Sequence, residues 1–217
     1  MNIYVLSAIS VVVAYLLGSL NFSIIISKLL LKKDIRNYGS GNAGSTNSLR
    51  VMGGKKTILV LLGDILKGVV AMIICNLICD SSILGETRVA SGIACVLGHS
   101  FPVYFGFRGG KGVLTTAAVG AFIDWRVCLT ALGIFFIVVT IWKFVSLGSI
   151  IAICSLPLLF YLYGGEYVIP NICFGFVIAV LVVYLHRGNI KRLVAGTENK
   201  LSFKKKEEKT DESSSNR

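Results

Sequence analysis

Residues 39–56 combine the residue types that bind phosphate in proteins. The stretch reads GSGNAGSTNSLR from Gly39, and a GGKK run follows at residues 53–56. Glycines let consecutive backbone N–H groups converge on an anion, and serine, threonine and arginine side chains add donors around it. The composition favours a phosphate site over the alternative, a flexible loop. Residues 39–44 also match the dinucleotide pattern G-x-G-x-x-G, but an apolar helical stretch precedes them instead of a strand, so we reject a nucleotide cofactor.

Two further segments place glycines beside cations. One reads GHSFPVYFGFRGGKGV from Gly98, and the other reads HRGNIKRLVAGTE from His186. Lys111 resembles the lysine of a P-loop, but Phe105 stands where that motif requires its first glycine, so there is no Walker A sequence. Three such segments in a chain with little other polar sequence indicate one site for a ligand that carries phosphate, and more than one phosphate group.

Three ionisable residues have roles that the sequence leaves open. His99 is either a general base that works near neutral pH or a hydrogen-bonded residue at a membrane boundary. Asp64 and Lys67 stand three residues apart, so on a helix they share a face and compensate each other's charge. This pair is either buried structure or part of a substrate path.

The elements that must position these residues are membrane helices. Hydrophobic residues make up 54% of the 217 residues, charged residues only 15%, and the mean hydropathy is +0.77. These values exclude a disordered chain, a coiled coil and an ordinary soluble domain. A helix of about 20 apolar residues crosses a bilayer. We therefore expect an all-α integral membrane protein with seven transmembrane helices, near residues 3–31, 57–79, 87–105, 112–123, 127–142, 148–163 and 167–186.

Basic residues give the expected orientation. With seven crossings and the N-terminus outside, Arg88 and Arg126 are the two basic residues that face outward. The stretch at 112–123 is short for a crossing, but without it the basic C-terminal tail would lie outside. We expect a cytoplasmic C-terminus, a membrane domain at residues 1–202 and a disordered charged tail at 203–217. The six cysteines show no metal-binding pattern, and we interpret them as packing residues.

The three glycine and cation segments are similar to the three motifs of the bacterial acyl-phosphate:glycerol-3-phosphate acyltransferase family. The matching stretches are GSGNAGSTNSLR, GHSFPVYFGFRGGKGV and NIKRLVAGTE, and the likeness includes DILKG at residues 64–68. It extends over nearly the whole chain, to about residue 202. Ser45 and Ser48 are mild departures from the first motif. The H-x-x-x-x-D sequence of thioester-dependent glycerolipid acyltransferases is absent, since Tyr104 follows His99 by five positions and Lys191 follows His186 likewise.

The resemblance implies an activity and a set of site residues. The activity is transfer of a fatty acyl group from acyl phosphate to the 1-hydroxyl of glycerol 3-phosphate, giving lysophosphatidate and phosphate, the first step of phospholipid synthesis. The implied catalytic residues are His99, Lys111 and Asn189. The implied substrate- and phosphate-binding residues are Ser40, Gly41, Asn42, Thr46, Asn47, Arg50, Arg108, Gly109, Gly110, Gly112 and Glu198. Either His99 or a substrate phosphate is expected to accept the hydroxyl proton.

The resemblance also implies partners and a location. The expected substrates are glycerol 3-phosphate and long-chain acyl phosphate, with membrane lipid around the protein and a soluble enzyme that forms acyl phosphate as a candidate partner. No metal or other cofactor is expected, and nucleic-acid binding is excluded because the loops lack stacking aromatics. The site should face the cytoplasm from the bacterial cytoplasmic membrane.

Two other functions are compatible with parts of the sequence. The main alternative is a membrane transporter of an anionic phosphorylated solute, because intramembrane charges often mark transport paths. Against it, seven spans do not form two equal halves, and the polar segments gather at one membrane face. A structural or regulatory membrane subunit would leave three phosphate-suited segments without a purpose.

Overall fold

The computed structural model describes residues 2–201, so the predicted tail at residues 203–217 lies outside the described part. All regular structure in residues 2–201 is helical, which confirms the predicted all-α class. Three short 3-10 helices are η1 (Ile35–Asn37), η2 (Ser81–Ile83) and η3 (Val103–Phe105). The α-helices are α1 (Ile3–Gly18), α2 (Phe22–Leu31), α3 (Ser45–Met52), α4 (Gly54–Ile78), α5 (Leu84–Ser100), α6 (Val113–Ile123), α7 (Trp125–Trp142), α8 (Val145–Cys154), α9 (Leu156–Tyr163), α10 (Val168–Leu185) and α11 (Arg187–Val194).

The described residues contain four or five candidate membrane spans. Four helical stretches are long and apolar enough to cross a bilayer: Ile3–Leu31, Gly54–Ile78, Trp125–Trp142 and Val168–Leu185. Helices α8 and α9 are bent by 41° and form a fifth span if they cross together. Helix α5 has 17 residues and α6 has 11, so both fall below the usual length. These two helices account for the difference from the seven crossings predicted from the sequence.

The predicted first span at residues 3–31 is a candidate span in the structure, but its helix is interrupted. The chain leaves helical geometry between Gly18 and Phe22, where α1 ends and α2 begins. The carboxamide of Asn21 accepts a hydrogen bond from the backbone N–H of Ile24 at 3.2 Å and so caps α2. The ammonium group of Lys67, on α4, donates to the carbonyls of Gly18 and Leu20, each at 3.0 Å. These side chains replace the backbone hydrogen bonds that the break removes.

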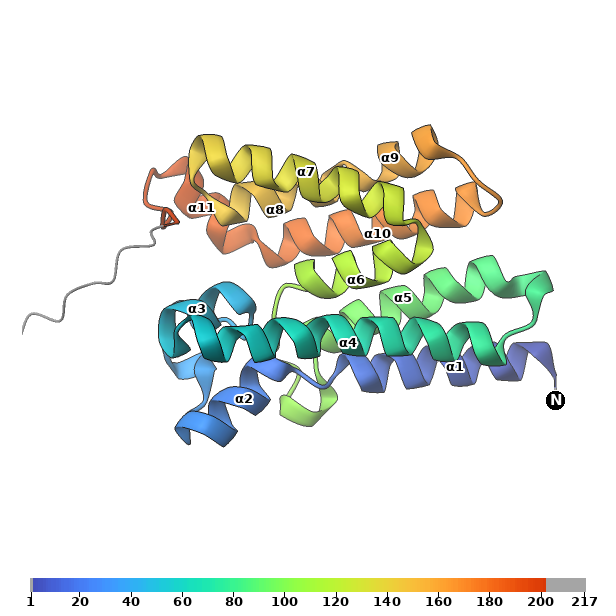
Figure 1. Cartoon of the computed structure of the whole chain (residues 1–217), viewed down its shortest axis with the longest axis horizontal. Helices are drawn as coiled ribbons and strands as arrows, with labels where there is room; N and C mark the ends of the chain where they lie inside the picture. The colour runs from blue at the N-terminus through green and yellow to red at the C-terminus, as the bar shows by residue number, and fades with distance from the viewer. Residues whose placement is uncertain (1, 202–217) are drawn as a thin grey trace, which may run out of the picture.

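The helices form two groups that α6 joins (Figure 1). Helices α1, α4 and α5 pack against one another, α7 to α10 form the second group, and α6 contacts both α4 and α7. Small residues bring α1 and α5 close together, because a Cβ on Gly18 would lie 2.1 Å from the carbonyl oxygen of Cys95. The hydroxyls of Ser10 and Ser91 are hydrogen-bonded between the same two helices at 2.9 Å.

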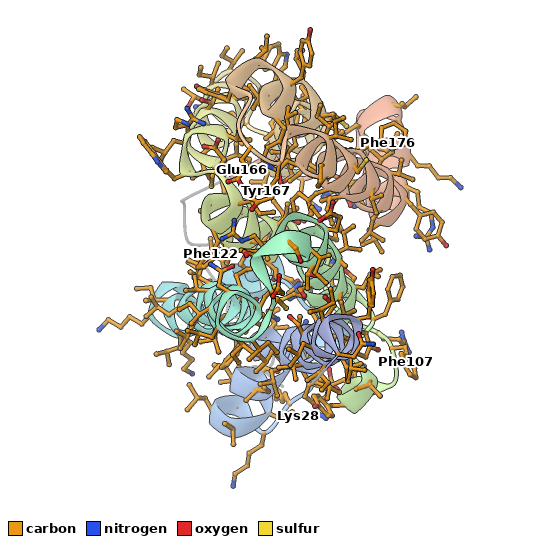
Figure 2. All side chains as sticks on the ribbon, turned by 90° about the vertical axis from the view of Figure 1, so that its right-hand side faces the viewer. Lys28, Phe107, Phe122, Glu166, Tyr167 and Phe176 are labelled. Atoms are coloured by element: carbon orange, nitrogen blue, oxygen red, sulfur yellow. The ribbon has the colours of Figure 1, made fainter. Side chains whose placement is uncertain are left out.

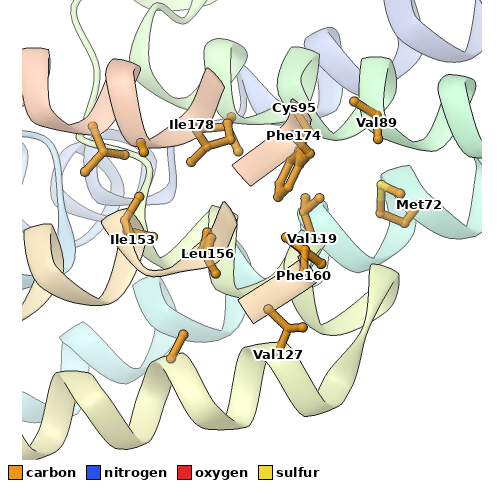
Figure 3. Packing of buried hydrophobic residues seen from close by; sticks show 14 of the residues in the cluster. Met72, Val89, Cys95, Val119, Val127, Ile153, Leu156, Phe160, Phe174 and Ile178 are labelled. Atoms are coloured by element: carbon orange, nitrogen blue, oxygen red, sulfur yellow. The ribbon is translucent and has the colours of Figure 1, made fainter. Parts of the chain in front are cut away.

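Apolar side chains from both groups meet in one core (Figure 3). The rings of Phe160 and Phe174 pack edge to face with their centroids 6.2 Å apart. Val119 of α6 and Phe174 both approach Gly92 of α5, where a Cβ would lie 2.7 Å and 3.2 Å from them. Helix α6 is therefore held in the core even though it is short.

The six cysteines are all free thiols. Cys75, Cys95 and Cys128 are buried, which agrees with their interpretation as packing residues. Cys154 and Cys173 are exposed on helix surfaces, so that interpretation does not extend to them.

One end of the bundle collects the polar segments, and we call it the loop end: residues 32–56, 101–112 and 186–201. Figure 1 shows α2, α3 and α11 at this end and the N-terminus at the other. Arg88 and Arg126 lie near the starts of α5 and α7, at the end opposite the loop end. In Figure 2, which looks from that opposite end, Lys28 and Phe107 point away from the helix body. The three segments singled out from the sequence thus share one end of the fold.

Candidate active site

The loop before α6 folds back on the last turn of α5. The backbone N–H of Gly109 donates to the carbonyl of Ser100 at 3.0 Å, and that of Gly110 donates to the carbonyl of His99 at 3.1 Å. Neither glycine has room for a side chain, because a Cβ on Gly109 would lie 2.1 Å from the carbonyl oxygen of His99. Gly112 has φ +76° and precedes α6. This glycine-rich turn therefore fixes the backbone on either side of Lys111.

Asn47 organises the loop that precedes α3. It is 2% exposed, and its amide nitrogen donates to the carbonyls of Ile35, Tyr38 and Asn42 at 3.0–3.3 Å. Its side-chain oxygen accepts the backbone N–H of Ser40 at 2.8 Å. Because both ends of the carboxamide bind the loop, Asn47 shapes the first segment from within. All of these hydrogen bonds lie within the loop, so they describe a structural role for Asn47 and not the predicted contact with substrate.

Other residues predicted in the first segment lie at its surface. Ser40, Gly41 and Arg50 are exposed, and Thr46 and Asn42 are half-buried. Helix α3 begins after Gly44 without a side-chain cap. Its first backbone N–H groups and the Thr46 hydroxyl therefore form a donor set of the kind that binds phosphate at helix N-termini.

Arg36 joins the first segment to the second. One guanidinium nitrogen donates to the carbonyls of Phe105 and Arg108, at 2.6 Å and 3.0 Å, and two other nitrogens bind the Asp34 carboxylate. The hydrogen bonds from Arg36 hold the pKa of Asp34 at about 2, against the opposing effect of burial. Arg108, predicted to bind substrate, has an exposed side chain. The contact that the structure shows for Arg108 is made by its backbone carbonyl.

Lys111 joins the second segment to the third. Its ammonium group donates to the side-chain oxygen of Asn189 on α11. The amide nitrogen of Asn189 donates to one oxygen of Glu198 at 2.6 Å, and the Arg192 guanidinium donates to the other at 2.7 Å. The hydroxyl of Ser146, at the start of α8, also donates to Glu198, at 2.8 Å. These five residues form one connected group.

The charges around Lys111 bring in the first segment as well. Burial lowers the pKa of the Lys111 ammonium group to about 8, the nearby Glu198 carboxylate opposes this, and Arg192 and Arg50 lower the pKa further. Arg50 on α3 is therefore close enough to act on Lys111. Charged and polar residues of the first and third segments, namely Arg50, Asn189, Arg192 and Glu198, thus surround Lys111 of the second segment. Such a group of cations can neutralise two or more phosphates.

The two histidines occupy different environments. His99 is 4% exposed, and its Nδ1 lies 2.9 Å from the ammonium group of Lys67. His186 is 2% exposed, and its Nδ1 lies 2.8 Å from the carbonyl oxygen of Val182. A carbonyl only accepts, so neutral His186 carries its proton on Nδ1 and keeps a lone pair on Nε2. Lys111 is among the charges that act on His186.

Several contributing residues were not predicted. Asn21, Arg36 and Ser146 have no motif that marks them, because their partners lie far away in the sequence. Arg192 stands three residues after Asn189 on α11, so helical spacing was a usable signal that the two side chains share a face. Arg192 belongs to the third of the predicted phosphate-binding segments but was not named as a site residue.

Comparison with known proteins gives a consistent result. The glycerol-3-phosphate acyltransferase family profile matches residues 8–196. A glycerol-3-phosphate acyltransferase of Halalkalibacterium halodurans is 45% identical over 199 residues, which cover 90% of this chain and 95% of the relative. A glycerol-3-phosphate acyltransferase of Thermoanaerobacter pseudethanolicus is 42% identical, covering 91% of this chain and 97% of the relative.

Solved structures agree with the sequence relatives. The crystal structure of PlsY, described as an integral membrane glycerol 3-phosphate acyltransferase, in its glycerol 3-phosphate form superposes with a TM-score of 0.83 at 37% identity. The match covers 90% of this chain and 96% of the other. The lysophosphatidic acid form gives a TM-score of 0.80 at 36% identity, covering 90% and 95% of the two chains.

Proposed function

Since this chain belongs to the glycerol-3-phosphate acyltransferase family, we propose that it moves a fatty acyl group from acyl phosphate to the 1-hydroxyl of glycerol 3-phosphate. The products are lysophosphatidate and inorganic phosphate. The observation that supports this most is the Lys111 group, in which Asn189, Glu198 and Arg192 surround a half-buried lysine at the loop end. Two phosphorylated substrates need such a concentration of cations in one place.

The reaction needs little covalent chemistry from the protein. The hydroxyl oxygen of glycerol 3-phosphate attacks the carbonyl carbon of acyl phosphate, and the bond from that carbon to the phosphate oxygen breaks. The electron pair of this bond leaves with the phosphate, which also receives the hydroxyl proton in the end. The enzyme must therefore place two anions next to each other and stabilise negative charge on the carbonyl oxygen. No covalent acyl-enzyme is part of this sequence.

Roles follow from the contacts around Lys111. We assign Lys111 to the phosphate groups, with Arg50 and Arg192 as neighbouring cations, and Asn189 and Glu198 to holding these cations in place. The turn formed by Gly109, Gly110 and Gly112, with the nearby Arg108, is the proposed cradle around the lysine. On the other side, the hydroxyls of Ser40 and Thr46 and the first backbone N–H groups of α3 are proposed to bind the second phosphate, with Gly41 and Asn42 in the loop that leads to them.

Two proton acceptors fit this arrangement. One is Nε2 of His186, which keeps a lone pair, and the other is a phosphate oxygen of a substrate, whose second pKa lies near 6. The variants His186→Gln and His186→Ala distinguish the two acceptors, because neither glutamine nor alanine has a basic nitrogen that could replace Nε2. A fall of about 100-fold in kcat for both variants indicates His186. A kcat that stays within about threefold indicates the phosphate.

We place the loop end in the cytoplasm and propose seven crossings. In Figure 1 the long helices run back and forth along the long axis, and the short α6 runs from the middle of the bundle toward the end opposite the loop end. The basic residues of residues 2–201 concentrate at the loop end. The site would then face the cytoplasm from the bacterial cytoplasmic membrane, where a soluble enzyme can deliver acyl phosphate. Labelling of Glu166→Cys by an impermeant maleimide on intact cells supports this orientation, and labelling of Arg108→Cys there contradicts it.

One assay tests the proposed reaction and its donor. Purified protein receives glycerol 3-phosphate with palmitoyl phosphate in one tube and with palmitoyl-CoA in another, and lysophosphatidate is measured in both. Product from palmitoyl phosphate alone supports the proposal. Product only from the CoA ester overturns the donor, and no product from folded protein in either tube favours the transporter.

A further inference from the structure

Three ionisable side chains are buried together below the loop end, and the proposed reaction does not use them. Asp64, Lys67 and His99 are 1%, 3% and 4% exposed. The Lys67 ammonium group lies 2.8 Å from an oxygen of Asp64 and 2.9 Å from Nδ1 of His99. Burying charged groups costs desolvation free energy, which must be offset by ion pairs and hydrogen bonds such as these.

The contacts of Lys67 decide where the proton of His99 lies. The ammonium group has three protons and faces four acceptors, namely the carbonyls of Gly18 and Leu20, the Asp64 carboxylate and Nδ1 of His99. Nδ1 of His99 lies 2.9 Å from the Lys67 ammonium group and 3.5 Å from an oxygen of Asp64. The nearer contact is with a donor, so we assign Nδ1 as an acceptor and place the proton of neutral His99 on Nε2. His99 therefore has no lone pair to offer to a substrate in this arrangement.

The other edge of the imidazole packs on the turn that carries Lys111. A Cβ on Gly110 would lie 2.2 Å from Nε2 of His99, so the ring and the glycine backbone are in direct contact. The backbone N–H of Gly110 also donates to the carbonyl of His99. Lys111 is the next residue in the chain, so the position of the His99 ring limits where the Lys111 backbone can lie.

The backbone carbonyl of His99 is also linked to the first segment, through Asn21. The amide nitrogen of Asn21 donates to the carbonyls of Ala43 and His99, at 3.2 Å and 3.4 Å. Asn21 directly follows Leu20, whose carbonyl accepts from Lys67. One buried ammonium group thus fixes the break after α1, the His99 ring and, through Asn21, the backbone at Ala43.

We propose that Lys67, compensated by Asp64, is a positioning residue for acyl transfer: it holds the His99 ring against Gly110 and so fixes the turn that presents Lys111. Asp64, Lys67 and His99 are then a support for the site. They are neither a transport path nor an acid–base pair. This inference rests on the proposed role of Lys111 in binding phosphate.

The first test compares two isosteric replacements of His99. In His99→Asn a side-chain oxygen takes the place of Nδ1 and still accepts from Lys67, whereas His99→Gln puts its polar atoms near Nε2 and leaves Lys67 without this partner. We expect His99→Asn to keep about a tenth or more of kcat/KM, and His99→Gln to lose about 100-fold. Equal loss in both variants, with unchanged melting temperatures, would overturn the proposal.

The second test is a double-mutant cycle on the chain with Lys67→Met and Asp64→Asn together, which removes both buried charges at once. If Lys67 acts through Lys111, adding Lys111→Ala to this background lowers kcat/KM by no more than about threefold, although Lys111→Ala alone costs about 100-fold or more. Losses that multiply would show that Lys67 acts independently of Lys111, and would overturn the inference.

A third measurement separates positioning from general damage. If the turn loosens, Lys111 becomes solvated, so the alkaline limb of kcat/KM should move from about pH 8 toward higher pH in the Lys67→Met/Asp64→Asn protein. The charged groups that act on Lys111 are Glu198, Arg192 and Arg50, and the titratable His186 also lies within the influence of Lys111. None of these residues is changed in the variant. An unmoved limb contradicts the inference. Full activity of Lys111→Ala, by contrast, would overturn the proposed function itself.

Discussion

The ammonium group of Lys111 and the side-chain oxygen of Asn189 are hydrogen-bonded although 78 residues separate them in the sequence. This contact joins the glycine-rich turn before α6 to helix α11. Glu198 and Arg192 continue the connection on the far side of Asn189. The lysine is therefore held in place before any substrate arrives, which reduces the rearrangement needed when a phosphate binds.

Replacing Lys111 by alanine should remove most of the activity and leave the fold intact. The reason is that Lys111 is the half-buried cation proposed to bind phosphate, and deleting one preorganised charge of this kind costs about 100-fold or more in kcat/KM. Lysophosphatidate formation measures the loss, and size-exclusion elution in detergent measures folding. Lys191→Ala is the matched control, since Lys191 is an exposed lysine on α11. Equal activity of the two variants would remove Lys111 from the site.

Deprotonation of Lys111 should determine the alkaline limb of the pH profile of kcat/KM. Burial favours the neutral amine and lowers the pKa of Lys111 to about 8, so above pH 8 the amine loses its proton and with it its attraction for phosphate. We expect kcat/KM, which reports the free enzyme, to fall above about pH 8. In Lys111→Arg the side chain stays charged throughout, so this fall should disappear from whatever activity remains. A fall that persists unchanged in Lys111→Arg argues for another group.

Glu198→Gln should lower kcat/KM by about tenfold or more, because a charged acceptor of three hydrogen bonds becomes neutral and one of its oxygens becomes a donor. Glu198 accepts from Asn189, Ser146 and Arg192, so the amide nitrogen of glutamine must face one of these donors. Glu166→Gln is the control, since Glu166 is an exposed glutamate at the opposite end. If both variants behave alike, Glu198 does not hold the site.

Gly110→Ala should destabilise the protein and abolish most of its activity. A methyl group there would lie 2.2 Å from Nε2 of His99 and 2.7 Å from the carbonyl oxygen of Ala43, and overpacking of this kind costs about 1–3 kcal/mol. Gly120→Ala on α6 is the control, because nothing lies within 4 Å of its added Cβ. Thermal unfolding in detergent should show a lower melting temperature for Gly110→Ala only. Equal melting temperatures would mean that the turn adjusts freely.

The sequence was sufficient for the helical class, the family and the gathering of three segments at one end. These follow from composition, from hydropathy along the chain and from long motifs, which are all local properties. Lys111, Asn189 and Glu198 were predicted as site residues from the same motifs, and the structure joins their side chains by hydrogen bonds.

The structural features that could not be predicted from the sequence depend on contacts between residues far apart in the chain. Asn47 stands in a phosphate-suited segment, but its carboxamide is used by the backbone of its own loop. The break after Gly18 coincides with Ser19 and the N-cap residue Asn21, but the Lys67 side chain that stabilises it comes from another helix. Ser146 carries no local signal, since its importance comes from Glu198, 52 residues away.

The hydrogen bond between Lys111 and Asn189 also has a consequence for biosynthesis. Residues 186–201 are synthesised last among those that build the site, and Lys111 lacks Asn189 and Glu198 until they have been made. A growing chain that has inserted α1 to α9 therefore holds the lysine without its partners. If Lys111 has its proposed role, translation products that stop before Asn189 should therefore lack acyltransferase activity even when their membrane helices have inserted.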